Sequence, residues 1–102
     1  MHLVQLLLPL RDNAGRAFPA SAFEPVRAEL TERFGGLTAY SRAPAEGLWE
    51  GADDGRARDD IVVYEVMADA LDRAWWRAFR AELERRFAQD EIVVRAHAIE
   101  RL

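Results

Sequence analysis

The sequence has no cysteine, and this absence excludes several classes of function. A disulfide scaffold, a cysteine nucleophile and a thiolate metal site all need the missing residue, and the absence fits a reducing compartment. Lysine is missing too, so all 14 basic residues are arginines. We attribute the abundance of alanine and arginine to the coding bias of a GC-rich bacterial genome, which carries no information about function.

The sequence also lacks a block of positive charge and a long apolar run. Its net charge is -4, and the arginines are scattered among carboxylates, which disfavours a nucleic-acid partner. The apolar run in MHLVQLLLPLRDN is too short to span a bilayer, and it ends in Pro-Leu-Arg-Asp where a signal peptide would have a small-residue cleavage site. We therefore interpret this run as a strand, and predict a cytoplasmic protein with no membrane partner.

The length and the patterning predict one domain over residues 1–102 with an α+β fold. Half of the 102 residues are hydrophobic, which is enough for one core without metals or disulfides. Apolar and β-branched runs predict strands, and apolar residues three and four apart predict helices. The predicted elements are a strand at 3–10, a helix at 22–34, strands at 37–42 and 60–67, a helix from an Asp69 cap to about Ala88, and a strand at 91–99.

Each predicted helix has an apolar stripe. In the first helix the stripe is formed by Phe23, Val26, Leu30 and Phe34, and Ser21 with Glu24 has capping-box spacing, although the nearby Pro25 conflicts with that start. In the second helix, Leu71, Trp75, Phe79, Leu83 and Phe87 lie four residues apart. This spacing predicts that Trp75 is buried against the sheet and that Trp76 lies to one side, at the core edge or against a partner or a loop.

The βαββαβ order is that of the ferredoxin-like sandwich, with a four-stranded antiparallel sheet and both helices on one face. Strand alternation then assigns side chains to the two faces. The purely apolar sets belong under the helices. The open face would hold Gln5, Glu65, Arg95 and His97 among Leu3, Leu7, Val63, Met67, Val93 and Ile99, with Tyr40 and Thr38 joining from the second strand.

An apolar sheet face with polar groups at its centre should not stay bare in water, so we predict a homodimer that packs sheet against sheet. The polar groups would line a cavity between the sheets. His97 and Glu65 are the candidate catalytic residues, because histidine titrates in the range that acid–base work needs. Arg95, Gln5, Tyr40 and Trp49 are the candidate ligand-binding residues, for a small anionic or carbonyl-rich ligand. The alternative is a structural polar cluster satisfied across the dimer interface.

Trp49 lies in the glycine-rich, charged stretch PAEGLWEGADDGRARDD at 44–60. A loop of this kind is usually solvated, so its tryptophan would either close the cavity or clasp the partner. The alternative is that Trp49 covers its own hydrophobic core. We predict no metal and no cofactor. The two histidines lack ligand spacing with the carboxylates, the aspartate pairs do not match a calcium loop, and Gly35-Gly36 ends a helix where a phosphate cradle would open one.

In topology and patterning, the whole chain resembles the dimeric α+β-barrel group of ferredoxin-like proteins. The runs RFGGLTAY, EGLWEG and ERRFAQDEIVVRA also resemble an uncharacterised family of small bacterial proteins with an RF…GLT…GxW…RF pattern. The dimeric α+β-barrel group includes cofactor-independent monooxygenases and muconolactone isomerase-like proteins. Two functions therefore remain open: a homodimeric interaction or structural module, and a small-molecule binder or cofactor-independent enzyme with its site on the open face.

Overall fold

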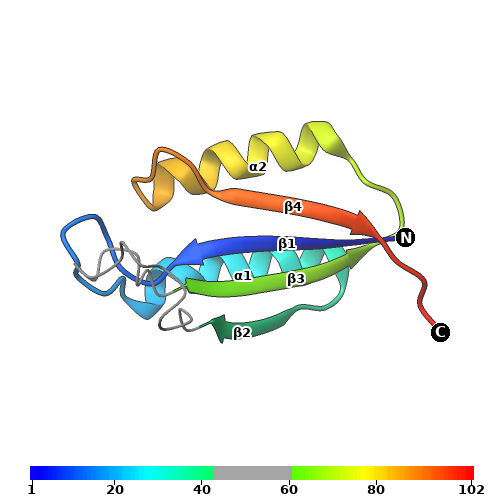
Figure 1. Ribbon diagram of the computed structural model, residues 1–102, viewed down its shortest axis with the longest axis horizontal. Helices are drawn as coiled ribbons and strands as arrows, with labels where there is room; N and C mark the ends of the chain where they lie inside the picture. The colour runs from blue at the N-terminus through cyan, green and yellow to red at the C-terminus, as the bar shows by residue number, and fades with distance from the viewer. Residues whose placement is uncertain (43–60) are drawn as a thin grey trace, which may run out of the picture.

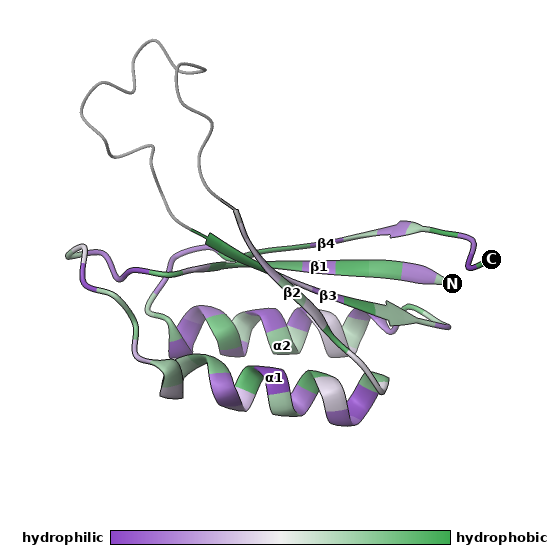
Figure 2. Ribbon diagram, turned by 90° about the horizontal axis from the view of Figure 1, so that it is seen from below, coloured by the Kyte–Doolittle hydropathy of each residue, from purple (hydrophilic) through white to green (hydrophobic). Residues whose placement is uncertain are grey.

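The computed structural model describes residues 1–42 and 61–102. The chain runs β1 (His2–Pro9), α1 (Ala20–Phe34), β2 (Thr38–Arg42), β3 (Ile61–Ala68), α2 (Arg73–Arg86) and β4 (Val93–Ala98). The strands form one antiparallel sheet in the order β2-β3-β1-β4, and Figure 1 shows β1 and β3 at its centre. Figure 2 shows both helices in one layer beneath the sheet. The predicted ferredoxin-like α+β fold is confirmed.

The core lies between the sheet and the helices. From the strands it takes alternate side chains, including Val4, Leu6 and Leu8 of β1. From α1 it takes Phe23, Val26 and Leu30, three members of the predicted stripe. The two helices are also joined at their outer surface, where Arg86 Nη1 donates to Glu29 Oε2 at 2.7 Å. The bond to Glu29 raises the pKa of Arg86 above its usual range.

The start of α1 differs from the prediction. The helix begins at Ala20 after Pro19, and no side chain caps it, so Ser21 and Glu24 do not form a capping box. Proline fixes φ near the helical value, but it has no side-chain oxygen to cap the helix and no backbone N–H to donate to a capping-box glutamate. The later Pro25 lies inside α1, which continues to Phe34 and ends at the left-handed Gly35 with φ 81°.

The start of α2 corrects a second prediction. Asp69 does not cap this helix; the N-cap is Asp72, whose side chain accepts a hydrogen bond from the Trp75 backbone N–H at 3.1 Å. Asp69 follows the last residue of β3, so the chain still needs the intervening residues to turn from the sheet toward the helix layer. Both aspartates have the chemistry of a cap, and the length of this connection decides which one is used.

The two adjacent tryptophans exchange the roles predicted for them. Trp76 is buried with 6% of its surface exposed, whereas Trp75 is only partly buried. Steps of four residues rotate by about 40° each around a helix, so the stripe from Leu71 to Phe87 cannot stay on one face. The buried set Trp76, Phe79, Leu83 and Phe87 has spacings of three, four and four, which nearly closes on whole turns.

Candidate functional site

The face of the sheet opposite the helices holds a row of polar side chains at its middle. Gln5 of β1 lies opposite Glu65 of β3 on one side and opposite Arg95 of β4 on the other. Thr38 and Tyr40 of β2 are paired with Glu65 and Val63, so they share this face. The face assignments predicted from strand alternation are therefore those found in the sheet.

Hydrogen bonds link four of these side chains into one network that crosses all four strands. The Tyr40 hydroxyl donates to Glu65 Oε2 at 3.0 Å, and Gln5 Nε2 donates to the same oxygen at 2.6 Å. Arg95 Nε then donates to Gln5 Oε1 at 2.9 Å. The Gln5 amide thus joins a carboxylate to a guanidinium, with its donor toward the negative group and its acceptor toward the positive group. We call Tyr40, Glu65, Gln5 and Arg95 the polar row.

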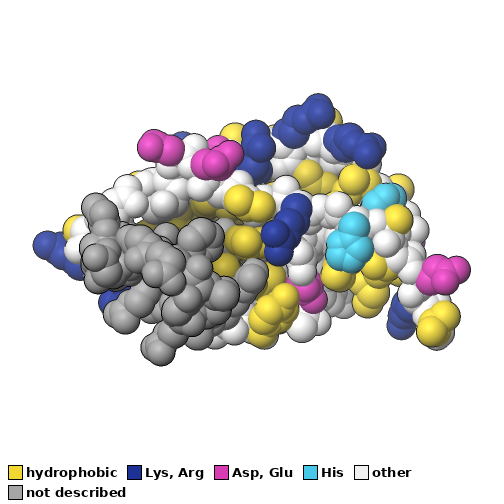
Figure 3. Space-filling model, in the orientation of Figure 1, with side chains coloured by type: hydrophobic (Ala, Val, Ile, Leu, Met, Phe, Trp, Pro, Cys, Tyr) yellow, Lys and Arg dark blue, Asp and Glu magenta, His cyan; other side chains and the backbone are white. Residues whose placement is uncertain are grey.

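The polar row lies among apolar side chains that are open to solvent. Val93 is 44% exposed, Met67 is 46% exposed and Tyr40 is 43% exposed. Leu3 and Leu7 of β1 lie between them, because each is paired with open-face residues of both neighbouring strands. Figure 3 looks onto this face and shows hydrophobic side chains beside charged ones. An exposed apolar sheet surface of this kind is a usual mark of an interaction site.

Two of the predicted site residues stand apart from the polar row. His97 is on the open face, opposite Leu3, and it is exposed. Within the described residues it makes no hydrogen bond or ion pair, so it is not joined to Glu65 or Arg95. Trp49 lies outside the described residues. The structure thus brings together Gln5, Glu65, Arg95 and Tyr40.

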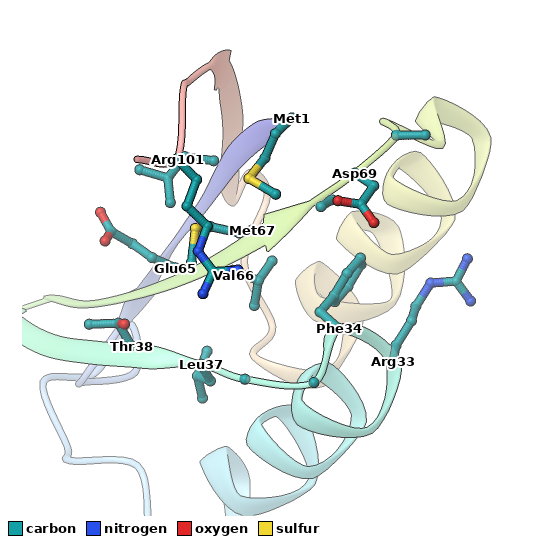
Figure 4. Close-up of a pocket in the computed structure, with 15 residues that line it drawn as sticks. Met1, Arg33, Phe34, Leu37, Thr38, Glu65, Val66, Met67, Asp69 and Arg101 are labelled. Atoms are coloured by element: carbon teal, nitrogen blue, oxygen red, sulfur yellow. The ribbon is translucent and has the colours of Figure 1, made fainter.

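A cavity of about 740 Å³ opens beside the polar row, at the end of the sheet where β3 finishes and β2 begins. Its walls come from the end of α1, the Gly35-Gly36 turn, the end of β3 and the C-terminal segment (Figure 4). Glu65, Thr38 and Met67 belong to both the open face and the cavity wall. A side chain added at Gly35 or Gly36 would meet nothing within 4 Å, so the backbone of this turn faces open space.

Two arginines line this cavity, and they lie differently. The Arg101 side chain extends from the C-terminal segment over β3 toward Val66, whereas Arg33 lies at the rim and points away (Figure 4). Arg33 is already engaged, because its guanidinium lies 4.2 Å from the centre of the Trp75 ring and 3.7 Å from Asp72. Arg101 makes no hydrogen bond or ion pair with the described part of the chain. It is the group best placed to meet a bound anion.

No local pattern in the sequence predicts this cavity. Gly35-Gly36 indicates only the end of a helix, and no pattern places Arg101. Their proximity depends on the C-terminal segment following β4 to the same end of the sheet, where the Ile99 N–H donates to the Met1 carbonyl at 3.0 Å. No local pattern encodes that contact. Among the described residues, no group of three or more histidine or acidic side chains could hold a metal ion.

In the described part of the chain, no helix has both the length and the hydropathy needed to cross a membrane. Neither a family model nor a curated protein sequence matches the chain. Among solved structures, it is similar to a phage SAM lyase in complex with S-methyl-5'-thioadenosine. The similarity has a TM-score of 0.56 at 13% sequence identity and covers 94% of this chain and 79% of that chain. At this identity the likeness shows a shared fold.

Proposed function

We propose that the chain is a homodimeric interaction module that assembles through its open sheet face. The observation that supports this proposal is the exposed apolar surface around the polar row, formed by side chains such as Val93 and Met67. A second copy would cover that surface on both molecules at once, because a two-fold axis places the same patch of each molecule in the interface.

The absence of cysteine favours a cytoplasmic location. Recovery of the protein from an oxidising compartment in cell fractionation would contradict that location.

The size of the face suits such an interface. Four strands about 4.8 Å apart, each with about six residues rising about 3.3 Å, give a projected area near 400 Å². Side-chain relief increases the accessible area beyond the projection, toward the roughly 800 Å² per partner of a standard interface. The face therefore approaches the area that one partner buries in a standard interface.

The polar row is also complementary to itself. It has the acidic Glu65 toward one edge and the basic Arg95 at the other. A two-fold axis parallel to the strands reverses the row in the second copy. Glu65 of each chain then faces the Gln5–Arg95 half of its partner, so opposite charges meet. An axis along the row would instead place Glu65 over Glu65, which like-charge repulsion opposes.

Sedimentation velocity at micromolar concentration tests the dimer. We expect the wild type to sediment as a dimer, and Met67→Glu to sediment as a monomer because it places a charge in the apolar interface. Ala81→Glu is the matched control, since Ala81 is exposed on α2, away from the open face. A monomeric wild type, or a Met67→Glu variant that dimerises as well as Ala81→Glu, would refute the proposal.

A second candidate function is supported by the cavity in Figure 4. We propose for it a small anionic or carbonyl-rich ligand, since Arg101 extends into a volume of about 740 Å³ with Leu37, Val66 and Met67 in its walls. The similar phage lyase binds S-methyl-5'-thioadenosine, which makes this nucleoside a reasonable first compound to try on the present chain. A cofactor-independent monooxygenase- or isomerase-like activity would use Glu65 and His97 at this end of the sheet.

Ligand screening by thermal shift tests this candidate, with S-methyl-5'-thioadenosine and small carboxylates as probes. We expect a stabilising probe to lose its effect in Arg101→Ala and to keep it in Arg16→Ala, because Arg16 does not line the cavity. If the stabilising effect is equal in both variants, the ligand binds elsewhere. His97→Ala should keep the stabilising effect in the same screen, since His97 is not part of the cavity wall.

A further inference from the structure

A second cavity, of about 350 Å³, lies between α2 and the edge strand β4. Its apolar lining includes Leu71, Trp76 and Val94, and its charged lining comes from arginines of both elements. No acidic residue is among its described lining. We call this cavity the α2–β4 groove. The whole chain has a net charge of -4, whereas the charged residues that line this groove are all positive.

The arginines follow from the sequence of α2. Arg73, Arg77 and Arg80 have spacings of four and three, so they lie along one stripe of the helix next to the buried face. Figure 3 shows basic side chains gathered along α2. Arg80 has a partner, because its Nε lies 3.8 Å from Glu84. Within the described residues Arg73 and Arg77 make no hydrogen bond or ion pair, so their charges are available to a ligand.

Trp76 provides an independent indication. Its side chain is 6% exposed and lines the groove, and its Nε1–H is buried with no hydrogen-bond acceptor in the described structure. Buried indole N–H groups nearly always have an acceptor, because leaving one unpaired is costly. Less than 1 Å² of the Nε1 atom is accessible, so an oxygen atom bound in the groove reaches this donor only when the side chains around it move apart on binding.

We propose that the α2–β4 groove binds the oxyanion of a small molecule, a phosphate or a carboxylate. One anionic oxygen accepts the Trp76 Nε1–H, and the Arg73 and Arg77 guanidiniums bind the remaining oxygens through charge-assisted hydrogen bonds. The groove volume is at the lower end of the range for small-molecule sites, which suits a charged group with a small organic body. Of the residues that line the groove, only Arg95 also belongs to the open sheet face, and the proposal does not depend on the proposed function.

The test follows the indole N–H signals in two-dimensional ¹H–¹⁵N NMR spectra of the full chain. Inorganic phosphate and malonate are titrated separately, so that the two arms distinguish phosphate from carboxylate chemistry. A parallel titration with sodium chloride at matched ionic strength controls for screening. Trp76→Phe and Trp75→Phe assign the signals. We expect a saturable shift of the Trp76 indole signal with at least one anion, and a much smaller response at Trp75.

Variants on α2 decide between a site and general attraction. Arg77→Gln should lower the affinity for the anion at least tenfold. Arg85→Gln should leave the affinity unchanged, because Arg85 lies outside the groove and pairs with Glu82. Preserved signal dispersion in each variant shows that it is folded. The proposal is overturned if chloride reproduces the shift, if the Trp76 signal does not move, or if Arg77→Gln and Arg85→Gln behave alike.

Discussion

Truncation of the two tryptophans of α2 tests the packing of the core. Trp76 is stacked on Phe34 with ring centroids 5.2 Å apart, and it meets Trp75 and Phe79 edge to face at 4.8 Å and 6.2 Å. The side chain is only 6% exposed, so its removal loses the stabilisation from burying nearly all of its surface and leaves a cavity. Trp76→Ala should therefore lower the free energy of unfolding by about 3–5 kcal/mol.

Trp75 is the matched comparison because it has the same side chain one residue earlier. It stacks on Phe79 at 4.8 Å, but it is only partly buried and its outer side is covered by the Arg33 guanidinium. Solvent can fill the space that it leaves, so Trp75→Ala should cost about 1–2 kcal/mol. Urea unfolding monitored by far-ultraviolet circular dichroism measures both variants. A cost for Trp75→Ala equal to or above that of Trp76→Ala would show that the helix is rotated from the described position.

Three further predictions concern the ends and the surface of the helices. Asp72→Ala should destabilise the fold by about 1 kcal/mol through loss of the N-cap, and Asp69→Ala should have much less effect on the midpoint of urea unfolding. Gly35→Ala should cost about 1 kcal/mol in the same assay because Gly35 has φ 81°, whereas Gly36→Ala, at a position with ordinary φ and open space, should be nearly neutral; equal costs would contradict this. The hydrogen bonds from Arg86 and Arg85 lower the pKa of Glu82, so its contribution to stability is present above the ordinary carboxyl range and is lost as the pH falls through the lowered value. Glu82→Gln should therefore flatten the acid side of the stability–pH profile, and an unchanged profile would argue against these bonds in solution.

The sequence was sufficient for the architecture because its strongest patterns are local. The apolar run of β1, the β-branched run of β3 and the two helical stripes specify the elements, and their order leaves few topologies. Strand alternation placed Gln5, Glu65 and Arg95 on one face, since a period of two leaves only two choices. That assignment predicts that the residues of the polar row share a face. Their hydrogen bonds could not be predicted, because they depend on which residues of neighbouring strands are paired.

The errors arose where several positions have equivalent local chemistry. Asp69 and Asp72 can both cap a helix, and only the path of the chain between β3 and α2 selects Asp72. Trp75 and Trp76 are adjacent and equally apolar, so the phase of the helix decides which is buried. His97 lies on the predicted face, and its catalytic role stays a prediction; it makes no hydrogen bond to the polar row, because the residue paired with it in β1 is Leu3. The Arg101 cavity and the α2–β4 groove depend on contacts between distant segments, which no local pattern shows.

The most direct test of the proposed dimer uses the self-complementary charges of the polar row. Glu65→Arg and Arg95→Glu are prepared as separate proteins and compared by sedimentation velocity, alone and mixed. Each variant alone should be monomeric at concentrations where the wild type is a dimer. Its polar row then carries two charges of the same sign, and these would face each other across the interface.

The equimolar mixture should form a heterodimer, since the arginine at position 65 of one chain then faces the glutamate at position 95 of the other. Recovery of dimer in the mixture, with neither variant dimeric alone, is the result that the proposed assembly predicts. A wild type that stays monomeric, or single variants that dimerise as strongly as the wild type, would contradict assembly through the open sheet face.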